Sequence, residues 1–455
     1  MANQQKQFVY MNGFGNEFES EVHEPGIGLV HNLPPPGQLN PQRCSNNLYA
    51  EQLSGTAFTA PRAAQRRSWL YRVRPSCKHG SFQPYTRNKC LDFNSAIADP
   101  NQRRWMPFES PHAGEVNFID GLALLGHSGD VASRSGSVAI YIYCFGLDMS
   151  VKRTCMQNSD GDMLLVPQRC PLIITTEFGR LRVEPKEICV IQQGMKFSID
   201  IESKCREGCS TQQSKCTARG YLLEIVGSHF ELPYLGPIGA NGLANARDFQ
   251  VPTAHVDADC RRTQSTSWRF INKFQNQLFK THQPHTPYDV AAWLGNYAPY
   301  KYDLRKFVAM NTVTIDHPDP SIFTVLTAPS LRPGTALADF VIFPPRWEVA
   351  GDTFRPPYYH KNCMTEFMGL IEGQYQAKSG AFAPGGASLH PAMSGHGPDK
   401  QCYDMAISQT LEPRRVADNS LAFMFETCMS LRLTRWACYD CSCIDQDYQH
   451  CWADL

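Results

Sequence analysis

Short apolar runs bounded by turn-forming residues recur along the chain. One run, SVAIYIYCF, occupies residues 137–145, and others occupy 163–166, 172–175, 187–191 and 221–226. Runs of this length, rich in β-branched and aromatic residues and separated by Gly, Pro, Asn or Asp, are typical of sandwich or barrel strands. Helical periodicity is rare. The pattern therefore predicts a mainly β protein with few short helices.

The 32 glycines and 32 prolines predict many tight turns and long ordered loops. Aromatic and aliphatic residues are interspersed among them, which is not the composition of a low-complexity linker. No repeat of fixed period is present. The polar, aromatic-poor stretch 275–287 is the best candidate for a seam, so we predict two domains, 1–282 and 283–455.

Length and charge limit the classes of function. A chain of 455 residues is long enough for two or three domains with cores of their own. Lys+Arg and Asp+Glu both number 43, so no net field attracts the protein to nucleic acid or to an anionic membrane. The start, MANQQKQFVYMNGF, lacks a basic segment followed by an apolar one, and no run of 18 apolar residues follows. We predict a cytoplasmic protein with neither kind of partner.

The 18 cysteines are expected to be mainly reduced thiols, because no signal peptide directs the chain to an oxidising compartment. One cluster, in a polar stretch that we interpret as a surface insertion, comprises Cys205, Cys209 and Cys216. A second, in the tail, comprises Cys438, Cys441, Cys443 and Cys451, with His450. A structural zinc site normally has paired Cys-x2-Cys knuckles, and the tail has one such spacing. We therefore interpret both clusters as loops.

The segment 354–400 concentrates candidate metal ligands, namely His360, Glu366, His390 and His396. Two imidazoles and one carboxylate can hold iron(II) and leave coordination positions open, which suggests a non-haem iron oxygenase. Histidines in Gly/Pro-rich loops are also commonly surface residues. The spacing alone leaves both interpretations open.

The spacing within this segment constrains the backbone. His360 and Glu366 are six residues apart, which is roughly 20 Å along a straight strand and a different face on a helix. They can share a metal ion only if His360 lies at a bend, and Pro356-Pro357 supplies one. The apolar run 363–371 predicts a mostly buried strand whose inward carboxylate, Glu366, needs a partner.

Motifs for other chemistries are missing from the sequence. It contains no G-x-x-x-x-G-K-[ST] phosphate loop and no H-E-x-x-H zinc helix. The Gly-His-Ser-Gly stretch at 126–129 lacks the G-x-S-x-G pattern of a nucleophile elbow. These absences weaken the nucleotide-hydrolase, metalloprotease and serine-hydrolase hypotheses.

Several long segments carry a resemblance to a known family. They include GFGNEFESE at 13–21, NNLYAEQLSGTAFTAPR at 46–62, NSDGDMLLVPQ at 158–168, ELPYLGPIGANGLANARDF at 231–249 and DPSIFTVLTAPSLRPGTALADFVIFPPRW at 319–347. Nearly end to end, the chain resembles the homogentisate 1,2-dioxygenases. The resemblance implies an N-terminal β-sandwich, a C-terminal cupin-like jelly-roll, and a homohexamer built as a dimer of trimers. It also implies a reaction of tyrosine and phenylalanine catabolism, in which Fe(2+) and O2 open homogentisate to 4-maleylacetoacetate.

The resemblance also assigns residues. His360, Glu366 and His396 match the H-x5-E pair and the H-G-P-D histidine that bind iron in the family. Tyr375 and His390, with His396, match positions that contact the aromatic acid. These residues are the expected metal and substrate ligands.

One motif departs from the family. Where the family reads W-H-G-N-Y-x-P-Y-K-Y, residues 293–302 read WLGNYAPYKY, so that Leu294 replaces a histidine expected to do acid/base work near the substrate. General acid–base catalysis contributes ~10²–10⁴-fold. His282, His285 and His390 are candidates to replace it. Two hypotheses follow: an active dioxygenase with altered acid/base support, favoured by the complete ligand set, or an iron-binding or structural relative with reduced or lost turnover, favoured by Leu294.

Overall fold

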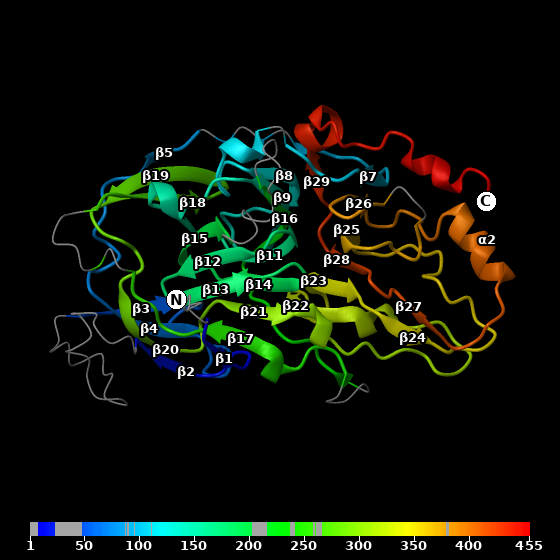
Figure 1. The fold of residues 1–455 in the computed structure, drawn as a ribbon, viewed down its shortest axis with the longest axis horizontal. Helices are drawn as coiled ribbons and strands as arrows, with labels where there is room; N and C mark the ends of the chain where they lie inside the picture. Colours follow the sequence, from blue (N-terminus) through cyan, green and yellow to red (C-terminus); the bar gives the residue numbers. More distant parts are fainter. Residues whose placement is uncertain are drawn as a thin grey trace, which may run out of the picture.

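The computed structural model describes residues 8–22, 48–86, 88, 91–94, 96–110, 112–202, 216–236, 242–257, 260, 266–378 and 382–455. Its strands form five sheets (Figure 1). Within the described ranges one α-helix occurs, α2 (Lys400–Ser408), beside short 3-10 and π-helical segments. The prediction of a mainly β protein with few short helices is confirmed. No helix in the described part of the chain is long and apolar enough to cross a membrane.

A ten-stranded sheet runs through the middle of the molecule. Its order is β1 (Tyr10–Asn12), β17 (Phe249–Pro252), β21 (Tyr300–Asp303), β14 (Glu187–Ile191), β11 (Asp162–Arg169), β16 (Ala218–Val226), β9 (Ser137–Phe145), β8 (Leu122–Ser128), β29 (Arg432–Thr434) and β6 (Ala96–Ile97). Strands β9 and β16 are buried at every position. Burial on both faces explains why their sequences are continuous apolar runs.

Two further sheets belong to the same part of the molecule. The seven-stranded sheet has the order β13 (Gly179–Val183), β12 (Leu172–Thr176), β15 (Lys196–Ile201), β10 (Thr154–Asn158), β18 (Trp268–Phe274), β19 (Gln277–Gln283) and β5 (Gln83–Pro84). The four-stranded sheet has the order β2 (Phe18–Glu21), β20 (Val290–Gly295), β4 (Arg67–Arg72) and β3 (Tyr49–Ser54). Strand β12 buries alternate residues, and Leu172 and Ile174 share one core with Leu164 of the ten-stranded sheet. Such sharing is expected of a sandwich.

The stretch 275–287, predicted as a seam, holds strand β19, which pairs with β18. Strands β20 and β21 follow it and pair with β4 and β14 of the first part. The division into 1–282 and 283–455 stays a prediction, and this pairing favours a boundary after Asp303.

A six-stranded sheet carries the histidine-rich segment. Its order is β22 (Thr324–Pro329), β23 (Ala336–Phe343), β28 (Leu421–Thr427), β25 (Thr365–Glu372), β26 (Ala387–His390) and β7 (Arg103–Trp105). A separate ladder joins β24 (Arg346–Glu348) to β27 (Arg414–Val416). Strand β7 comes from the first quarter of the chain, whereas β29 from the end of the chain joins the ten-stranded sheet. Each of the two parts therefore contains a strand from the far end of the chain.

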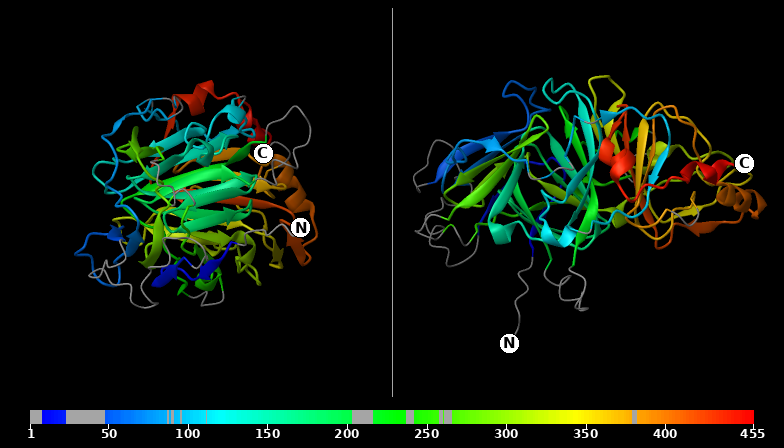
Figure 2. Two further views of the ribbon diagram at one scale, coloured as in Figure 1. Left: turned by 60° about the vertical axis from the view of Figure 1, so that its left-hand side comes forward. Right: turned by 90° about the horizontal axis from the view of Figure 1, so that it is seen from above.

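Alternation along β25 and β28 gives the six-stranded sheet two different faces. Phe367 and Phe423 face the ten-stranded sheet, where the rings of Tyr221 and Phe423 lie 4.8 Å apart. A Cβ at Gly369 would lie 2.3 Å from the Phe423 ring, so this close approach requires glycine. The right-hand view of Figure 2 shows the two sheets side by side. The alternate residues of β25, including Glu366 and Met368, have their side chains on the opposite face of the six-stranded sheet.

Candidate metal centre and substrate pocket

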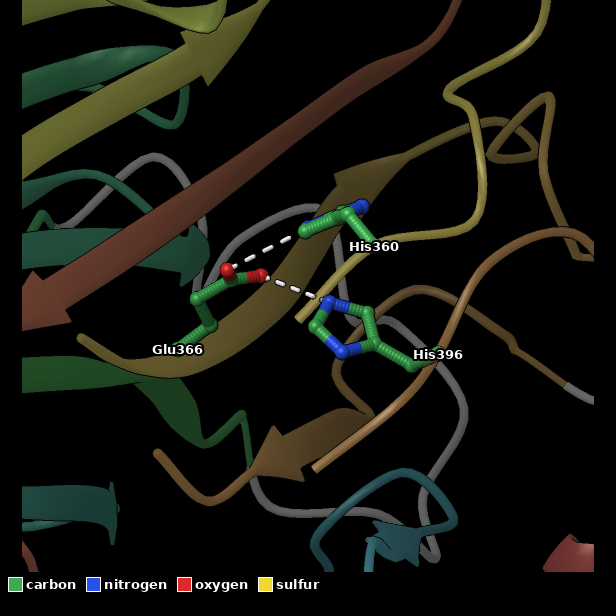
Figure 3. A group of neighbouring side chains, drawn as sticks. All are labelled: His360, Glu366 and His396. Atoms are coloured by element: carbon green, nitrogen blue, oxygen red, sulfur yellow. Dashed lines mark hydrogen bonds and ion pairs between the residues drawn. The ribbon is translucent and has the colours of Figure 1, made fainter. Parts of the chain in front are cut away.

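Three of the predicted ligands meet at one point (Figure 3). Nε2 of His360 lies 3.4 Å from Oε1 of Glu366, and Nε2 of His396 lies 2.9 Å from Oε2 of the same carboxylate. One ligand atom from each residue lies within 4.8 Å of the others. Among the described residues, this is the one such group of three or more His, Cys, Asp or Glu side chains. No described arrangement of this kind involves the cysteines of the tail.

A bend separates His360 from Glu366, as predicted, but it lies at residues 363–364 rather than at His360. His360 lies outside β25 and forms an isolated bridge with His396, in which each backbone N–H donates to the other's carbonyl at 3.0 and 3.1 Å. Asn362 accepts a hydrogen bond from the backbone N–H of Met364 at 3.0 Å, which stabilises the turn into the strand. The turn lets a histidine and a glutamate six residues apart converge.

Each ligand histidine is oriented by its own backbone. Nδ1 of His360 lies 2.8 Å from the carbonyl oxygen of Tyr358, and Nδ1 of His396 lies 3.0 Å from that of Ser394. A carbonyl can only accept, so each Nδ1 carries the proton and each Nε2 is left as a lone-pair donor toward Glu366. Metal-binding histidines are commonly held in this way.

The electrostatics of the group favour a cation. The hydrogen bond to Glu366 raises the pKa of His360, although burial opposes the shift. Burial alone would raise the pKa of Glu366, but hydrogen bonds from His360 and His396 outweigh it and hold that pKa well below its usual range. The buried carboxylate therefore stays ionised. Without a metal, a second proton on an imidazole could partner Oε2.

Two further acids extend the group across the sheet. Glu366 on β25 stands opposite Glu426 on β28, which stands opposite Asp339 on β23. Nδ2 of Asn362 donates to Oε1 of Glu366 at 3.0 Å and also contacts Glu426. Burial raises the pKa of Glu426 to about 7 and that of Asp339 to about 6. This end of the site is acidic, with protons available near neutral pH.

A cavity of about 530 Å³ adjoins the metal ligands, a size that suits a small aromatic molecule. The predicted substrate contacts Tyr375 and His390 line it, together with His396. Burial raises the pKa of the Tyr375 hydroxyl, which therefore stays a neutral donor. Apolar walls are provided by Val341, Phe343, Met368 and Met424.

The end of the chain reaches this cavity through His390. The Tyr448 hydroxyl lies 2.9 Å from Nε2 of His390, while Nδ1 of that imidazole is buried with no hydrogen-bond partner among the described residues. The His390 and His396 rings are stacked with centroids 4.1 Å apart. Burial lowers the pKa of His390, so the imidazole is neutral. Lys378, which donates to the carbonyl of Gly397 at 2.9 Å, packs on the Trp452 ring.

Leu294 lies outside the candidate metal centre and its cavity. Its strand, β20, belongs to the four-stranded sheet, and the side chain packs on a cluster that includes Val22, Leu48 and Ala292. In Figure 1 this sheet and α2 lie at opposite ends of the molecule. Leu294 is not among the residues that line the cavity. A side chain at position 294 can reach such a cavity only if another subunit brings it there.

The three histidines proposed as replacements differ in position. His390 lines the cavity, whereas His282 and His285 are not among its lining residues. His282 contacts Ser267, and Nδ1 of the buried His285 lies 2.8 Å from the carbonyl of Thr286. Of the three, only His390 is placed to contact a ligand bound beside the triad.

The cysteine clusters are separate from the centre. Cys205 and Cys209 lie outside the described residues, and Sγ of Cys216 lies 3.3 Å from Sγ of Cys170. In the tail, Cys438 and Cys441 are buried in the large hydrophobic core. The interpretation of the tail cluster as a loop stays a prediction, and at these two positions the thiols pack in the core.

Sequence reasoning missed Asp339, Glu426, Arg346 and Tyr448, all of which line the cavity or touch His390. For Asp339 and Glu426 a signal existed, since each is a lone acid in an apolar strand, ALADFVIF and LAFMFET. The same signal had identified Glu366. No comparable sequence pattern points to Tyr448, because it lies 58 residues beyond its partner His390.

Comparison with known proteins assigns the chain to a family. The model of the homogentisate 1,2-dioxygenase N-terminal part matches residues 9–304, and the model of the C-terminal part matches residues 305–455. The chain belongs to the homogentisate 1,2-dioxygenase family. It is 52% identical to the enzyme of that name from Mus musculus and 51% identical to that from Homo sapiens, in each case over 98% of this chain and 96% of the relative.

Solved structures with some likeness are far more distant. One, a cupin 2 conserved barrel domain protein from Leptotrichia buccalis, is 7% identical, covers 67% of this chain and 88% of its own, and has a TM-score of 0.26. Membership of the family therefore rests on the sequence comparisons.

Proposed function

We propose that the protein opens the ring of homogentisate with O2 to give 4-maleylacetoacetate, using Fe(2+) held by His360, Glu366 and His396. The observation that carries the proposal is the convergence of two Nε2 atoms and one ionised carboxylate beside a cavity of about 530 Å³, in a chain of this family. Tyrosine and phenylalanine breakdown is the corresponding pathway.

The donor set fits iron(II). Both imidazoles are neutral when their Nδ1 protons are donated to carbonyls, so the three residues offer two nitrogens and a single negative charge. A bound iron ion would supply Lewis acidity and a common template for the aromatic acid and O2. Asn362 holds Glu366 through Oε1 and limits rotation of the carboxylate.

The cavity residues have roles of their own. The apolar walls exclude water and hold the ring, and the neutral Tyr375 hydroxyl can donate a hydrogen bond to the substrate. His390 lines the same space, and its Nδ1 is buried without a partner among the described residues. With Leu294 at the family's acid/base position, His390 is the imidazole best placed to exchange a proton with a bound hydroxyl.

The second candidate is an iron-binding relative with reduced or lost turnover. Leu294 is the observation in its favour. Against it, Leu294 lies outside the cavity of its own chain, so the replacement leaves the ligand set and the cavity walls intact. A cytoplasmic location and a homohexamer built as a dimer of trimers remain predictions, and sedimentation analysis checks the latter.

The test is oxygen uptake with homogentisate after anaerobic loading with Fe(2+). The parent protein is expected to bind one iron per chain and consume O2, whereas His360→Ala and Glu366→Ala are expected to lose both iron and activity. His112→Ala is the matched control, because the His112 side chain is 78% exposed and remote from the ligands. Iron content with no oxygen uptake would favour the second candidate, and unchanged iron in either ligand variant would contradict the metal assignment.

A further inference from the structure

A buried arginine stands at the edge of the cavity without a full set of partners. Arg346, at the start of β24, lines the cavity, and its side chain is 8% exposed. One terminal nitrogen lies 3.1 Å from Oε1 of Gln376 and 3.4 Å from Oε1 of Glu348. The Nε atom is buried and has no hydrogen-bond partner among the described residues. An unpaired buried donor on a charged group is costly, so such a group normally has a function.

The charge of Arg346 is not cancelled by its neighbours. Among the described residues, Glu348 is the one acid paired with it, and the other oxygen of that carboxylate lies 3.3 Å from Arg414. One carboxylate thus faces two guanidinium groups, which leaves a positive charge. Arg355 is a second cation in the cavity wall. It already donates hydrogen bonds to the backbone carbonyls of Ala350 and Glu412.

The cavity wall therefore carries charges of both signs. The metal ligands and the acids Glu366, Glu426 and Asp339 line it, and so does Arg346. Aromatic contacts connect Arg346 to the predicted substrate contact Tyr375: Arg346 lies 5.0 Å from the Phe323 ring, Phe323 lies 5.3 Å from Phe343, and Phe343 lies 5.4 Å from Tyr375. The charges of Arg346 and Glu366 both act on the pKa of Tyr375, which Arg346 lowers and Glu366 raises.

We propose that Arg346 binds the carboxylate of the aromatic acid and so selects substrates that carry an acidic side chain. The inference rests on the proposed function and adds the specificity determinant. With the ring hydroxyls at the metal ligands and the ring against the apolar walls, the carboxylate can reach Arg346 in the cavity wall. There the terminal N–H groups of Arg346 can donate to it, because a guanidinium and a carboxylate match in geometry.

The two lysines in the cavity wall are less suitable. Lys361 is exposed to solvent, and Lys378 donates to the carbonyl of Gly397 and lies 4.2 Å from the Trp452 ring. Burial lowers the pKa of Lys378 to about 8, so a larger fraction of its amino groups is uncharged near neutral pH. Arg346 is the cation that combines burial with a donor still unpaired.

The test compares homogentisate with methylhydroquinone, which has the same ring and hydroxyls but no carboxylate. Dissociation constants are measured anaerobically with the iron-loaded full chain, and kcat/KM is measured with O2. In Arg346→Met, affinity for homogentisate is expected to fall about 10- to 100-fold, the value of a hydrogen bond to a charged group. Affinity for methylhydroquinone should change less than twofold. Arg346→Lys should recover part of the loss because it restores the charge.

Arg435→Met is the control, since that side chain is 68% exposed and distant from the cavity. Iron content and the thermal midpoint are measured for each variant, and Arg346→Gln serves if Arg346→Met does not fold. Equal losses for both ligands, or no loss for either, would overturn the proposal. The dissociation constants are measured without turnover, so they test the role of Arg346 independently of catalysis. A parent protein that binds homogentisate but consumes no O2 would contradict the proposed function alone.

Discussion

Removal of a single hydroxyl tests whether the end of the chain assists the site. Tyr448→Phe deletes the group that lies 2.9 Å from Nε2 of His390. The ring should stay in place, because Arg104 lies 4.6 Å above it and is itself anchored by Asp445. The substitution therefore removes the hydrogen bonds of the hydroxyl, to His390 and to Ser388, and keeps the packing.

The expected effect follows from the protonation states. Burial raises the pKa of Tyr448 and lowers that of His390, so a neutral phenol meets a neutral imidazole. Their hydrogen bond fixes which ring nitrogen carries the proton, and so fixes what Nδ1 offers to the cavity. A neutral hydrogen bond contributes about 0.5–1.5 kcal/mol, which corresponds to a fall of about 2- to 13-fold in kcat/KM for homogentisate. Iron content should be unchanged.

The assay is a double-mutant cycle of Tyr448→Phe with His390→Ala, read as kcat/KM from oxygen uptake. Since Tyr448 is expected to act as a positioning residue through His390, its substitution should have no further effect once the imidazole is gone. Trp452→Phe is the control, because Trp452 packs in the same tail and donates to the carbonyl of Pro398 without touching His390. An equal fall in both backgrounds would refute the reasoning and assign Tyr448 a general structural role.

Three further predictions concern residues outside this pair. Leu294→His places an imidazole on an apolar cluster and should lower the free energy of unfolding by about 1–3 kcal/mol; any rise in oxygen uptake should disappear on dilution, because only another subunit can bring position 294 to the cavity. Gly369→Ala should lower the free energy of unfolding by about 1–3 kcal/mol in urea denaturation, because its Cβ would lie 2.3 Å from the Phe423 ring. Burial raises the pKa of Asp339 from 3.8 to about 6, so its contribution to stability is present below pH 3.8 and is lost as the pH rises through 6. Asp339→Asn should therefore stabilise the metal-free protein relative to the parent above pH 6 and not at pH 4, and a constant difference across this range would contradict the shift.

The sequence by itself determined the strands and the local form of the ligand segment. Continuous apolar runs such as SVAIYIYCF predicted β9, because a strand covered on both faces needs no polar position. A histidine and a glutamate six residues apart required a bend, and a bend lies between them at residues 363–364. Each of these features depends on neighbours within a few residues, which is the range over which a pattern of residue types is informative.

Only the tertiary structure decided which distant residues share the site. Pairing of β25 with β28 placed Glu426 beside Glu366, and the tail brought Tyr448 to His390. The ladder of β24 and β27 set Arg346 and Arg414 on either side of Glu348. Pairing of β20 with β2 and β4 set Leu294 apart from the cavity, although its motif had suggested proximity. Strand register and sheet packing depend on the summed burial of the whole chain, and no short segment of sequence contains that sum.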